Sequence, residues 1–422
     1  MTTVPAATSA TAVAGPLLAT ESLRGALLWL MGFSGAFVFI EPSPYEIVGL
    51  VAILLFAVTG LTLRAALVPL LLLLVLLNVG YAAAVVQVSD QSKPVIWVLV
   101  SAFLATTAVF YAAMLGDNTQ YRLELLMRGY LAAALIASLV AVAAYFRLFG
   151  GASDLFVLYS RARGTFNDPN VLGAFLVLPG LLLFQRMLAG RLVVRSTLML
   201  LLMLAALLLS FSRAAWGQFA FAAAVMMGLT FVTSRSVNER MRIVLVAVLG
   251  LVVISALVVA LLSLGQVADL FKERATLDQS YDVGRYGRFG RYLMGADIAL
   301  EHPFGIGPLQ FSKLFAEDPH NTFLNAFMSG GWFAGFAYLT LSAVTLVMST
   351  RFVFVRTPWQ PIYHAVYAAY LGVVAESVII DIDHWRHYFL ILGVLWGLMA
   401  ASRPYLTAAP AGSQASIRGA PA

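Results

Sequence analysis

The sequence predicts an all-α integral membrane protein, and three observations support this prediction. Of the 422 residues, 61% are hydrophobic and only 11% are charged, whereas a soluble domain carries roughly 25% charged residues. The mean hydropathy is +0.90. The apolar runs are continuous rather than alternating and are about 20 residues long, which is the length that one helix needs to cross a bilayer. We therefore expect helices that span a membrane.

About twelve apolar segments are each long enough for one crossing. Backbone groups in lipid must be satisfied within a helix or a closed barrel, and continuous apolar runs favour helices. The expected spans are 24–40, 47–63, 66–88, 94–115, 129–149, 169–188, 193–210, 214–233, 243–264, 321–348, 360–380 and 385–401. The expected organisation is a disordered cytoplasmic tail (1–23), spans 1–9 (24–264), a large loop (265–319), spans 10–12 (320–402) and a second disordered cytoplasmic tail (403–422).

The arginines of the short loops predict the orientation, because cytoplasmic loops are rich in Lys and Arg. One set of loops holds Arg64, Arg122, Arg128, Arg186, Arg191, Arg195, Arg235, Arg240, Arg242, Arg351 and Arg356. The other set has few cations and is placed outside, which puts the loop 265–319 and a shorter segment, 150–168, in the periplasm of a Gram-negative cell. The net charge of +6 then reflects topology, and we expect no nucleic-acid partner.

The long outer loop is expected to contain a helix on the membrane surface. Between Phe289 and His302 the residues Phe289, Leu293, Ala296 and Leu300 recur at spacings of three and four, which is a helical pattern. Pro303 should end this helix, and Gly305 and Gly307 should form a tight turn. The segment is too short and too charged to cross the membrane.

Arginines on the expected outer side are the first candidates for a functional site. Arg213 ends the seventh span, and an arginine near the membrane core costs about 2.5–3.5 kcal/mol unless something offsets it. A bound diphosphate would do so, because the guanidinium fork suits phosphate. The alternative is snorkelling to lipid headgroups or pairing with an acid. The same choice applies to the other outer arginines, Arg161, Arg163, Arg285, Arg288 and Arg291, of which Arg285 has acids at Asp278 and Asp282 nearby.

His320 and Asn321 begin the tenth span, directly after the arginine-rich loop. A neutral imidazole is a good general base near neutral pH, so His320 is a candidate for taking a proton from a hydroxyl group. The alternative is a solvated histidine at a helix start. Asn321 is a candidate for binding the substrate, or the helix-start neighbour of His320 rather than a catalyst.

Two further polar stretches have competing interpretations. In NDPN, Asp168 and Pro169 favour a helix start, and Asn170 could still lie beside an anion bound there. In DIDHWRH, the residues Asp381, Asp383 and His384 could hold a divalent metal. They could equally form a polar cap in which Asp383 pairs with Arg386 or His387, and we favour the cap.

Glu376, inside the preceding span, is a functional candidate or an acid that faces water. The chain has no cysteine, which excludes disulfides and thiolate sites.

Four motifs in order resemble one known family. They are RGTFNDPNVLGAFLVLPGLL from Arg163, SFSRAAWGQFAFA from Ser210, HPFGIGPLQF from His302 and PHNTFLNAFMSGGWFAGF from Pro319. Together they are similar to the O-antigen ligase and Wzy-type polymerase superfamily, over roughly residues 160 to 340, and the layout of about twelve spans agrees over the rest.

The resemblance implies a GT-C-type membrane glycosyltransferase of surface polysaccharide biosynthesis. Its donor would be a glycan on undecaprenyl diphosphate, its acceptor a second glycan or lipid A–core, and it would need no metal or other cofactor. By the resemblance, Arg213 matches the diphosphate-binding arginine and His320 the histidine proposed to activate the acceptor. An arginine of the long loop, either Arg288 or Arg291, also belongs to the pattern, although Met294 stands where the family usually has an aromatic residue. The resemblance leaves ligase and polymerase open, with a weak preference for an exopolysaccharide polymerase.

Two other functions are weighed against this one. A transporter or flippase of lipid-linked glycan would show inverted repeats and spans broken near the midplane, and the sequence has no convincing internal repeat. A metal-dependent enzyme would use Asp381, Asp383 and His384. The sequence is silent on sugar identity, linkage and oligomeric state.

Overall fold

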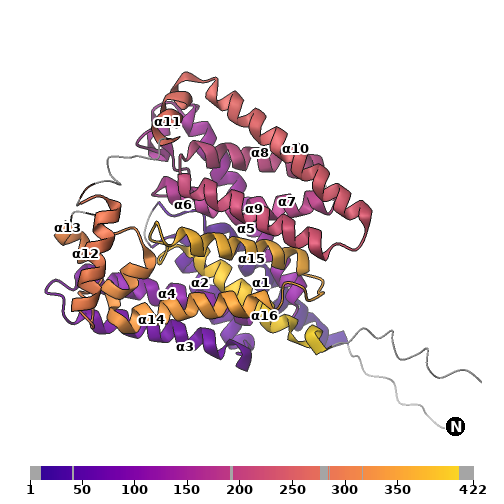
Figure 1. Cartoon of the computed structure of the whole chain (residues 1–422). Coiled ribbons are helices and arrows are strands. Elements are labelled where there is room, and N and C mark those ends of the chain that lie inside the picture. Colours follow the sequence, from indigo (N-terminus) through magenta and orange to yellow (C-terminus); the bar gives the residue numbers. More distant parts are fainter. Residues whose placement is uncertain are drawn as a thin grey trace, which may run out of the picture.

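In the part of the chain that the structure describes, all regular elements are helices apart from one two-stranded hairpin (Figure 1). The computed structural model describes residues 11–39, 42–190, 193–275, 284, 286–315 and 317–407. The elements of the first part are α1 Thr11–Ser34, α2 Pro44–Thr59, η1 Ala65–Leu67, α3 Val68–Val85, α4 Ser92–Met114, α5 Thr119–Tyr145, η2 Gly150–Phe156, β1 Val157–Leu158 and β2 Arg161–Ala162. The second part contains α6 Pro169–Phe175, α7 Val177–Leu188, α8 Val193–Leu209, α9 Arg213–Thr233, α10 Val237–Leu262, α11 Gly265–Ala275, α12 Arg288–Glu301, α13 Phe311–Phe315, α14 Thr322–Thr350, α15 Gln360–Glu376 and α16 Arg386–Thr407.

Among the described residues, eight helices are long and apolar enough to cross a membrane. They are η1 with α3, α4, α5, α6 with α7, α9, α10, α14 and α16. Two shorter apolar helices, α2 and α8, also match expected spans. The helices α1 and α15 lie at the two remaining expected spans but belong to neither group. The all-helical class is thereby confirmed, and the count of about twelve spans stays a prediction.

Several element boundaries differ from the sequence prediction. Helix α1 begins at Thr11, inside the segment 1–23 that was expected to be a disordered tail. Helix α5 begins at Thr119, ten residues before the expected span. In α5 polar residues continue the helix before its apolar part, and in α1 small residues such as Ala12 and Ala14 do so; neither kind of residue marks a membrane span by its hydropathy. The expected tail segments 1–10 and 408–422 lie outside the described residues.

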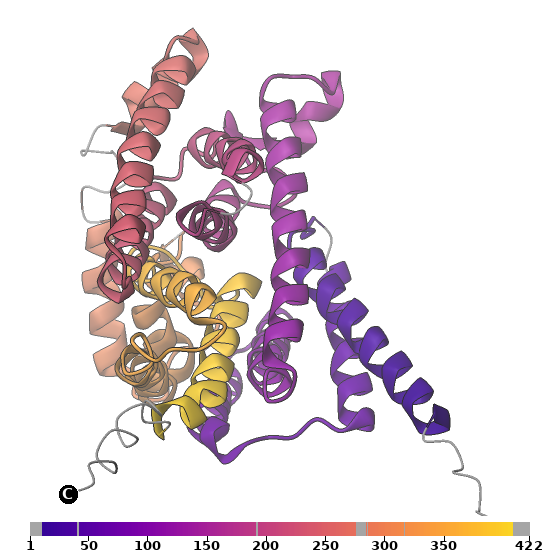
Figure 2. The ribbon, with the colours of Figure 1, turned by 90° about the vertical axis from the view of Figure 1, so that its right-hand side faces the viewer.

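The start of α1 and the end of α16 lie at one end of the bundle, and α12 and α13 lie at the other (Figure 1). Figure 2 looks at the molecule from the end that carries the two termini of the helical part. The first and last described helices therefore end on the side of the bundle opposite α12 and α13, and the membrane side on which each lies stays a prediction.

Small residues allow the closest helix contacts, as is typical of helices packed in membranes. A Cβ atom at Gly129 of α5 would lie 2.0 Å from the carbonyl oxygen of Trp29 in α1. A Cβ atom at Gly80 of α3 would lie 2.8 Å from the Cβ atom of Ala334 in α14. The pairs α1–α5 and α3–α14 are therefore packed backbone to backbone.

Helix α10 is the opposite case. The most apolar 18-residue stretch of α10 has a mean hydropathy of 3.2, the highest of the eight long helices. Only 6% of that stretch is buried within the protein. It lies along the edge of the bundle in Figure 1. Its apolar surface is therefore available to lipid rather than to other helices.

The long loop contains the predicted helix. Helix α12 spans Arg288–Glu301, against the expected Phe289–His302, and the chain leaves the helix before Pro303. Gly305 and Gly307 follow with φ values of 76° and 93°, which glycine adopts without strain. The turn predicted from these residues is confirmed, whereas the position of α12 at a membrane surface stays a prediction.

The two faces of α12 differ in exposure. Phe289, Leu293 and Leu300, from the predicted apolar face, are more than half exposed. The opposite face, with Arg291 and Gly295, is buried, and Gly295 lies against α14. An exposed apolar stripe opposite a face that is buried against the protein is the arrangement expected of a helix that lies on lipid.

Helix α14 is broken in its middle, at Gly331, which has φ 69° and ψ −170°. In an unbroken helix the N–H of Trp332 would donate to the carbonyl of Met328, four residues earlier. Instead, the Trp332 N–H donates to the carbonyl oxygen of Pro303 at 2.8 Å, and the Met328 carbonyl accepts from the N–H of Ile306 at 2.8 Å. The turn that follows α12 therefore supplies both partners for the helical hydrogen bond that α14 lacks.

Candidate active site

Arg213 is the first residue of α9 and is half-buried. The helix is capped by Ser212, whose side-chain oxygen accepts from the N–H of Ala215 at 3.4 Å. A helix N-terminus carries partial positive charge and outward-pointing N–H groups. The guanidinium adds a full positive charge at the same place, so this helix start suits an anion.

Arg161 joins three separate segments around Arg213. Its Nε donates to the carbonyl oxygen of Ser210 at 2.8 Å, and its Nη2 donates to the side-chain oxygen of Asn170 at 2.8 Å. The β-hairpin, the turn before α9 and the start of α6 therefore meet here. We call Arg161, Asn170, Ser210 and Arg213 the arginine cluster; the structure brings three of the predicted site residues together in it.

Arg163 binds its own loop. It donates to the carbonyl oxygens of Leu155 at 3.0 Å and Asn167 at 3.3 Å. It is half-buried, and its Nε is buried with no hydrogen-bond partner within the described part of the chain. The start of α6 is capped as predicted, since the Asp168 carboxylate accepts from the N–H of Asn170 at 2.7 Å.

His320 lies immediately before α14 in a left-handed backbone conformation, with φ 53°. Asn321 caps the helix, because its side-chain oxygen accepts from the N–H of Leu324 at 3.0 Å. The interpretation of Asn321 as a helix-start residue is therefore confirmed. The imidazole of His320 has 38% of its surface exposed, and its Nδ1 lies 3.6 Å from Oδ2 of Asp381.

Asp381 and Asp318 lie near His320, and Asp383 lies near these two carboxyl groups. Burial raises the pKa of Asp381, and the contact with His320 opposes this rise, while the neighbouring carboxylate of Asp383 adds to it. Burial likewise raises the pKa of Asp318, against a hydrogen bond from Ser312. We call His320, Asp318, Asp381 and Asp383 the turn cluster.

The DIDHWRH turn is held by hydrogen bonds to other helices. Asp383 accepts from the Asn325 amide of α14 at 2.9 Å and lies 3.5 Å from Nδ1 of His384. The Nε2 of His384 lies 3.0 Å from the carbonyl oxygen of Trp97 in α4. Within the described ranges, no three His, Asp or Glu side chains are placed to share a metal ion. These contacts favour the polar cap over the metal-site alternative.

The partners predicted within that cap were wrong. Arg386 donates to Glu46 at the start of α2, at 2.7 and 2.6 Å, and not to Asp383. His387 is 3% exposed and packs against Phe175 and Trp385. Tertiary packing brings α2 next to α16, and a stronger acid partner than the local one becomes available.

Helix α12 contributes two arginines with different environments. Arg291 is 3% exposed, and its Nη1 forms an ion pair with Glu317 at 2.5 Å. Arg288 is half-buried at the first position of the helix. For Arg291 the alternative of pairing with an acid is therefore observed. Arg285 lies outside the described residues, as do Asp278 and Asp282.

Glu376 and Gln218 join the helices that carry the two clusters. The Gln218 amide of α9, oriented so that both of its ends are satisfied, donates to Glu376 of α15 at 2.9 Å. Gln218 is five residues after Arg213, and Glu376 is five residues before Asp381. Glu376 is 3% exposed, so of its two interpretations the one in which it faces water is wrong, and it remains a functional candidate.

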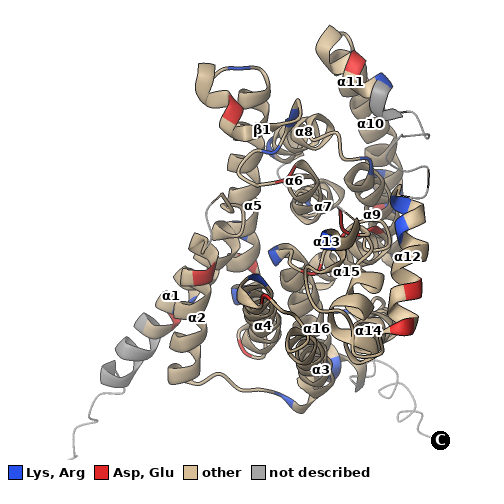
Figure 3. Ribbon diagram, turned by 90° about the vertical axis from the view of Figure 1, so that its left-hand side faces the viewer, with Lys and Arg blue, Asp and Glu red and all other residues tan. Residues whose placement is uncertain are grey.

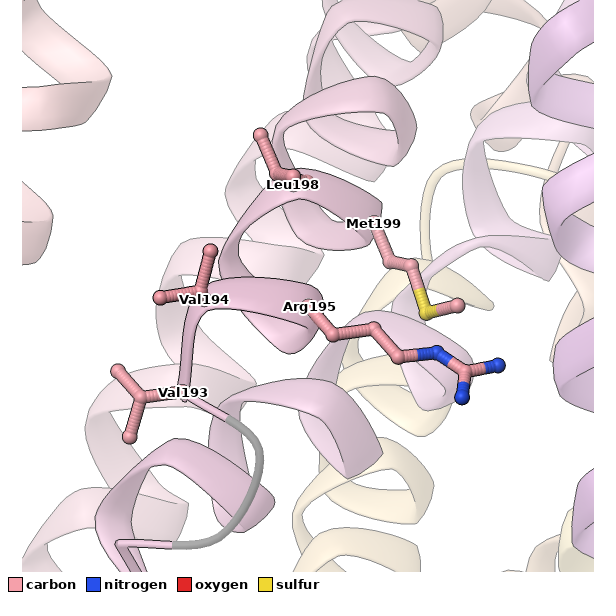
Figure 4. A pocket seen from close by; sticks show the side chains of 5 residues that line it. All are labelled: Val193, Val194, Arg195, Leu198 and Met199. Atoms are coloured by element: carbon pink, nitrogen blue, oxygen red, sulfur yellow. The ribbon is translucent and has the colours of Figure 1, made fainter.

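Charged residues gather at the helix ends and in the connections, while the middles of the helices carry few (Figure 3). The hollow in Figure 4 is lined by Val193, Val194, Arg195, Leu198 and Met199, at the start of α8. A helix of 17 residues is about 25 Å long, and the arginine cluster lies beyond the other end of α8. This hollow is therefore not part of the candidate active site.

Residues 198–339 match the protein-family model Wzy_C, described as O-antigen ligase. The resemblance to the O-antigen ligase and Wzy superfamily is confirmed over this segment. The match covers about a third of the chain. No curated protein matches the chain.

The segment that matches the O-antigen ligase model runs from α8 into α14 and includes Arg213, Arg288, Arg291, His320 and Asn321. The hairpin arginines, Asn170 and the turn that carries Asp381 lie outside it. The candidate site therefore combines residues of the matched segment with residues that precede and follow it.

Sequence reasoning missed three members of the site. Asp318 was passed over as part of a polar loop, and Asn325, four residues after Asn321, as part of an apolar run. Tyr292 was not singled out, yet its hydroxyl donates to the carbonyl oxygen of His320 at 3.1 Å. The spacing of Asn321 and Asn325 on one helix face was an available signal; for the other two residues we find none.

Proposed function

We propose that the protein transfers a glycan from undecaprenyl diphosphate to an acceptor hydroxyl group, as an O-antigen ligase or as an O-antigen or exopolysaccharide polymerase. It would act in the inner membrane, with its site facing the periplasm. The observation that carries the proposal is the pairing of His320 with Asp381 in a chain that matches the O-antigen ligase model and places Arg213 at a helix N-terminus.

The arginine cluster would bind the diphosphate. As the bond between the anomeric carbon and the phosphate oxygen breaks, the diphosphate leaves with the electron pair and its negative charge grows. Fixed cations and helix N–H groups stabilise this charge most where it is largest, which lowers the barrier rather than only binding the donor. Arg213 is the leading residue in this role, with Arg161 and Asn170 from the same cluster and Arg163 from the adjoining loop.

His320 would act as the general base. Its Nδ1 faces Asp381, so Nε2 carries the lone pair that accepts the hydroxyl proton of the acceptor. The acceptor oxygen then forms the new bond to the anomeric carbon on the face opposite the leaving group, which inverts the anomeric centre. Charged Asp381 would stabilise the imidazolium that results.

Of the two arginines of α12, we assign the contact with the donor to Arg288. Arg291 is buried and bound to Glu317, so its role would be to hold the helix. Asn321, whose side chain caps α14, would position His320 rather than bind the substrate.

A small apolar cavity is lined by Phe211 and by side chains of α8, α10 and α11. It supports an apolar environment near Arg213 for the lipid part of the donor.

The test is in vitro transfer with purified protein, a defined undecaprenyl-diphosphate oligosaccharide and candidate acceptors, with and without chelator. We expect Arg213→Ala to lower kcat by about 10²–10³-fold and His320→Ala by about 10²–10⁴-fold. Matched controls are Arg351→Ala and His302→Ala, both exposed residues, which should retain activity. Transfer at the wild-type rate by either site variant would disprove the assigned role, and full dependence on a divalent metal would contradict the mechanism.

The same experiment separates ligase from polymerase. A ligase extends lipid A–core and leaves the lipid-linked glycan at its original length. A polymerase lengthens the lipid-linked glycan. Movement of lipid-linked sugar across liposomes, with no glycosidic bond formed, would instead indicate a transporter.

A further inference from the structure

Tyr292 connects α12 to both halves of the turn cluster. Its hydroxyl lies 3.1 Å from the carbonyl oxygen of His320 and 2.9 Å from the carbonyl oxygen of Val378, which belongs to the turn between α15 and α16. One side chain thus bridges the peptide of the base and the turn that carries Asp381.

The backbone of His320 needs such support. A left-handed conformation is unfavourable for a residue with a Cβ atom and persists where the surroundings impose it. The φ of 53° at His320 sets the direction of its side chain. A group that holds the carbonyl of His320 therefore also holds the imidazole in place relative to Asp381.

Helix α12 is itself fixed at both ends. Near its start, Arg291 is paired with Glu317, three residues before His320. At its far end, the indole N–H of Trp332 donates to the carbonyl oxygen of Ala299 at 2.7 Å, and the following turn completes the broken hydrogen bond of α14. Tyr292 is therefore presented to His320 by a helix that has little freedom to move.

We propose that Tyr292 is a positioning residue, which holds the His320 peptide and the Asp381 turn at a fixed separation. Helix α12 then links the binding of the donor to the placement of the base. The link follows from helix geometry, since Arg288 and Tyr292 are four residues apart and share one face. A diphosphate held by Arg288 would fix the same helix turn that presents the Tyr292 hydroxyl. This inference rests on the proposed function.

The test is Tyr292→Phe, which removes the hydroxyl and keeps the ring, compared with Tyr405→Phe at the opposite end of the bundle. We expect kcat to fall on the order of 10- to 100-fold, as small misplacements of catalytic groups do, with the KM for the lipid-linked donor unchanged. An unchanged kcat would overturn the proposal. A raised donor KM with normal kcat would also overturn it, because Tyr292 would then contact the substrate.

The controls separate this proposal from the proposed function. If wild type and Tyr405→Phe show no transfer with any acceptor, the proposed function fails; if both are active and Tyr292→Phe is equally active, only the role of Tyr292 fails. Should Tyr292→Phe not purify as folded protein, Tyr292→Gln and Tyr292→Leu are compared in native membranes at matched protein level. The amide of glutamine retains a donor, so a rate for the leucine variant equal to or above that of the glutamine variant would overturn the proposal.

Discussion

Helix α5 has an arginine site at each end, and the two sites differ in what the arginine binds. At the start of the helix, Arg122 is 4% exposed and its Nε and Nη2 donate to the carboxylate of Glu21 in α1 at 2.8 and 3.0 Å. Beyond the other end, Arg163 is held by the backbone carbonyls of Leu155 and Asn167. The first arginine has an acid as its partner, and the second has neutral acceptors.

The difference separates a structural arginine from one that can serve a ligand. The Glu21 carboxylate neutralises the charge of Arg122, so this pair produces little net electrostatic potential around it. Carbonyl groups orient a guanidinium without cancelling its charge, which remains available to a phosphate. Substitutions at the two sites should therefore affect different properties, stability at Arg122 and donor binding at Arg163.

The largest effect on stability should come from substitution of Arg122, near the start of α5. Arg122→Ala leaves the Glu21 carboxylate without its main partner. Breaking a fully buried pair costs about 3–5 kcal/mol, which is an upper limit here because the Glu21 side chain is 24% exposed and also pairs with Arg24. The ring of Phe56 also loses the cation 5.3 Å from its centroid. We expect a lower midpoint of thermal unfolding in detergent and normal turnover per folded molecule.

Arg128→Ala is the matched control, because Arg128 is on the same helix and its pair with Glu124 is exposed. Exposed pairs contribute about 0–1 kcal/mol. Equal stability losses for the two variants would show that the buried pair at the start of α5 has no special structural role.

A smaller effect, on binding of the lipid-linked donor, should come from substitution of Arg163. Arg163→Gln keeps a donor for the carbonyls and removes the charge, so the KM for the lipid-linked donor should rise on the order of tenfold, in line with about 1.5–3 kcal/mol for hydrogen bonds to charged groups. The thermal midpoint should change little. Arg147→Gln, from an exposed pair with Asp154, should leave the donor KM unchanged, and equal effects of the two variants would contradict the contrast.

The smallest effect should be a shift in pH dependence. Burial raises the pKa of Asp381, and the charges of Asp383 and Asp318 add to the rise, while His320 opposes it. A carboxyl with a raised pKa is neutral at pH values where an ordinary aspartate is charged, and a neutral Asp381 cannot stabilise the imidazolium. The rate should therefore fall as the pH drops through the raised pKa of Asp381.

Asp318→Asn removes one of the negative charges that raise this pKa, so the acidic limb of the rate profile should move to lower pH. The control is Asp297→Asn, an exposed residue of α12. The measurement is kcat against pH for both variants, and an acidic limb that moves to higher pH in Asp318→Asn would contradict the assignment of Asp381.

Local patterns predicted the local features. Apolar runs located the long helices, the spacing of three and four together with Pro303 located α12, and the helix starts at Asp168 and Asn321 followed from their capping residues. Each of these depends on residues close together in the chain, where side-chain chemistry alone selects the conformation.

Contacts across the fold were not predictable in the same way. Arg386 and Glu46 are 340 residues apart, and Tyr292 and Val378 are 86 residues apart. Nothing near Arg386 indicates that an acid from the second helix will displace the acid beside it. The same holds for the break at Gly331, since a glycine in an apolar helix does not show which turn will supply its missing hydrogen bonds.

Helix α10 has a practical consequence for anyone who purifies this protein. Only 6% of the most apolar stretch of α10 is buried within the protein, and the C-terminal end of this helix leads into α11, whose Phe271 stacks on Trp216, near the start of α9. Detergent that strips the annular lipid would therefore loosen α10 first and disturb the neighbourhood of Arg213. Preparations that retain or restore lipid, such as nanodiscs, should report the native rate more faithfully than micelles.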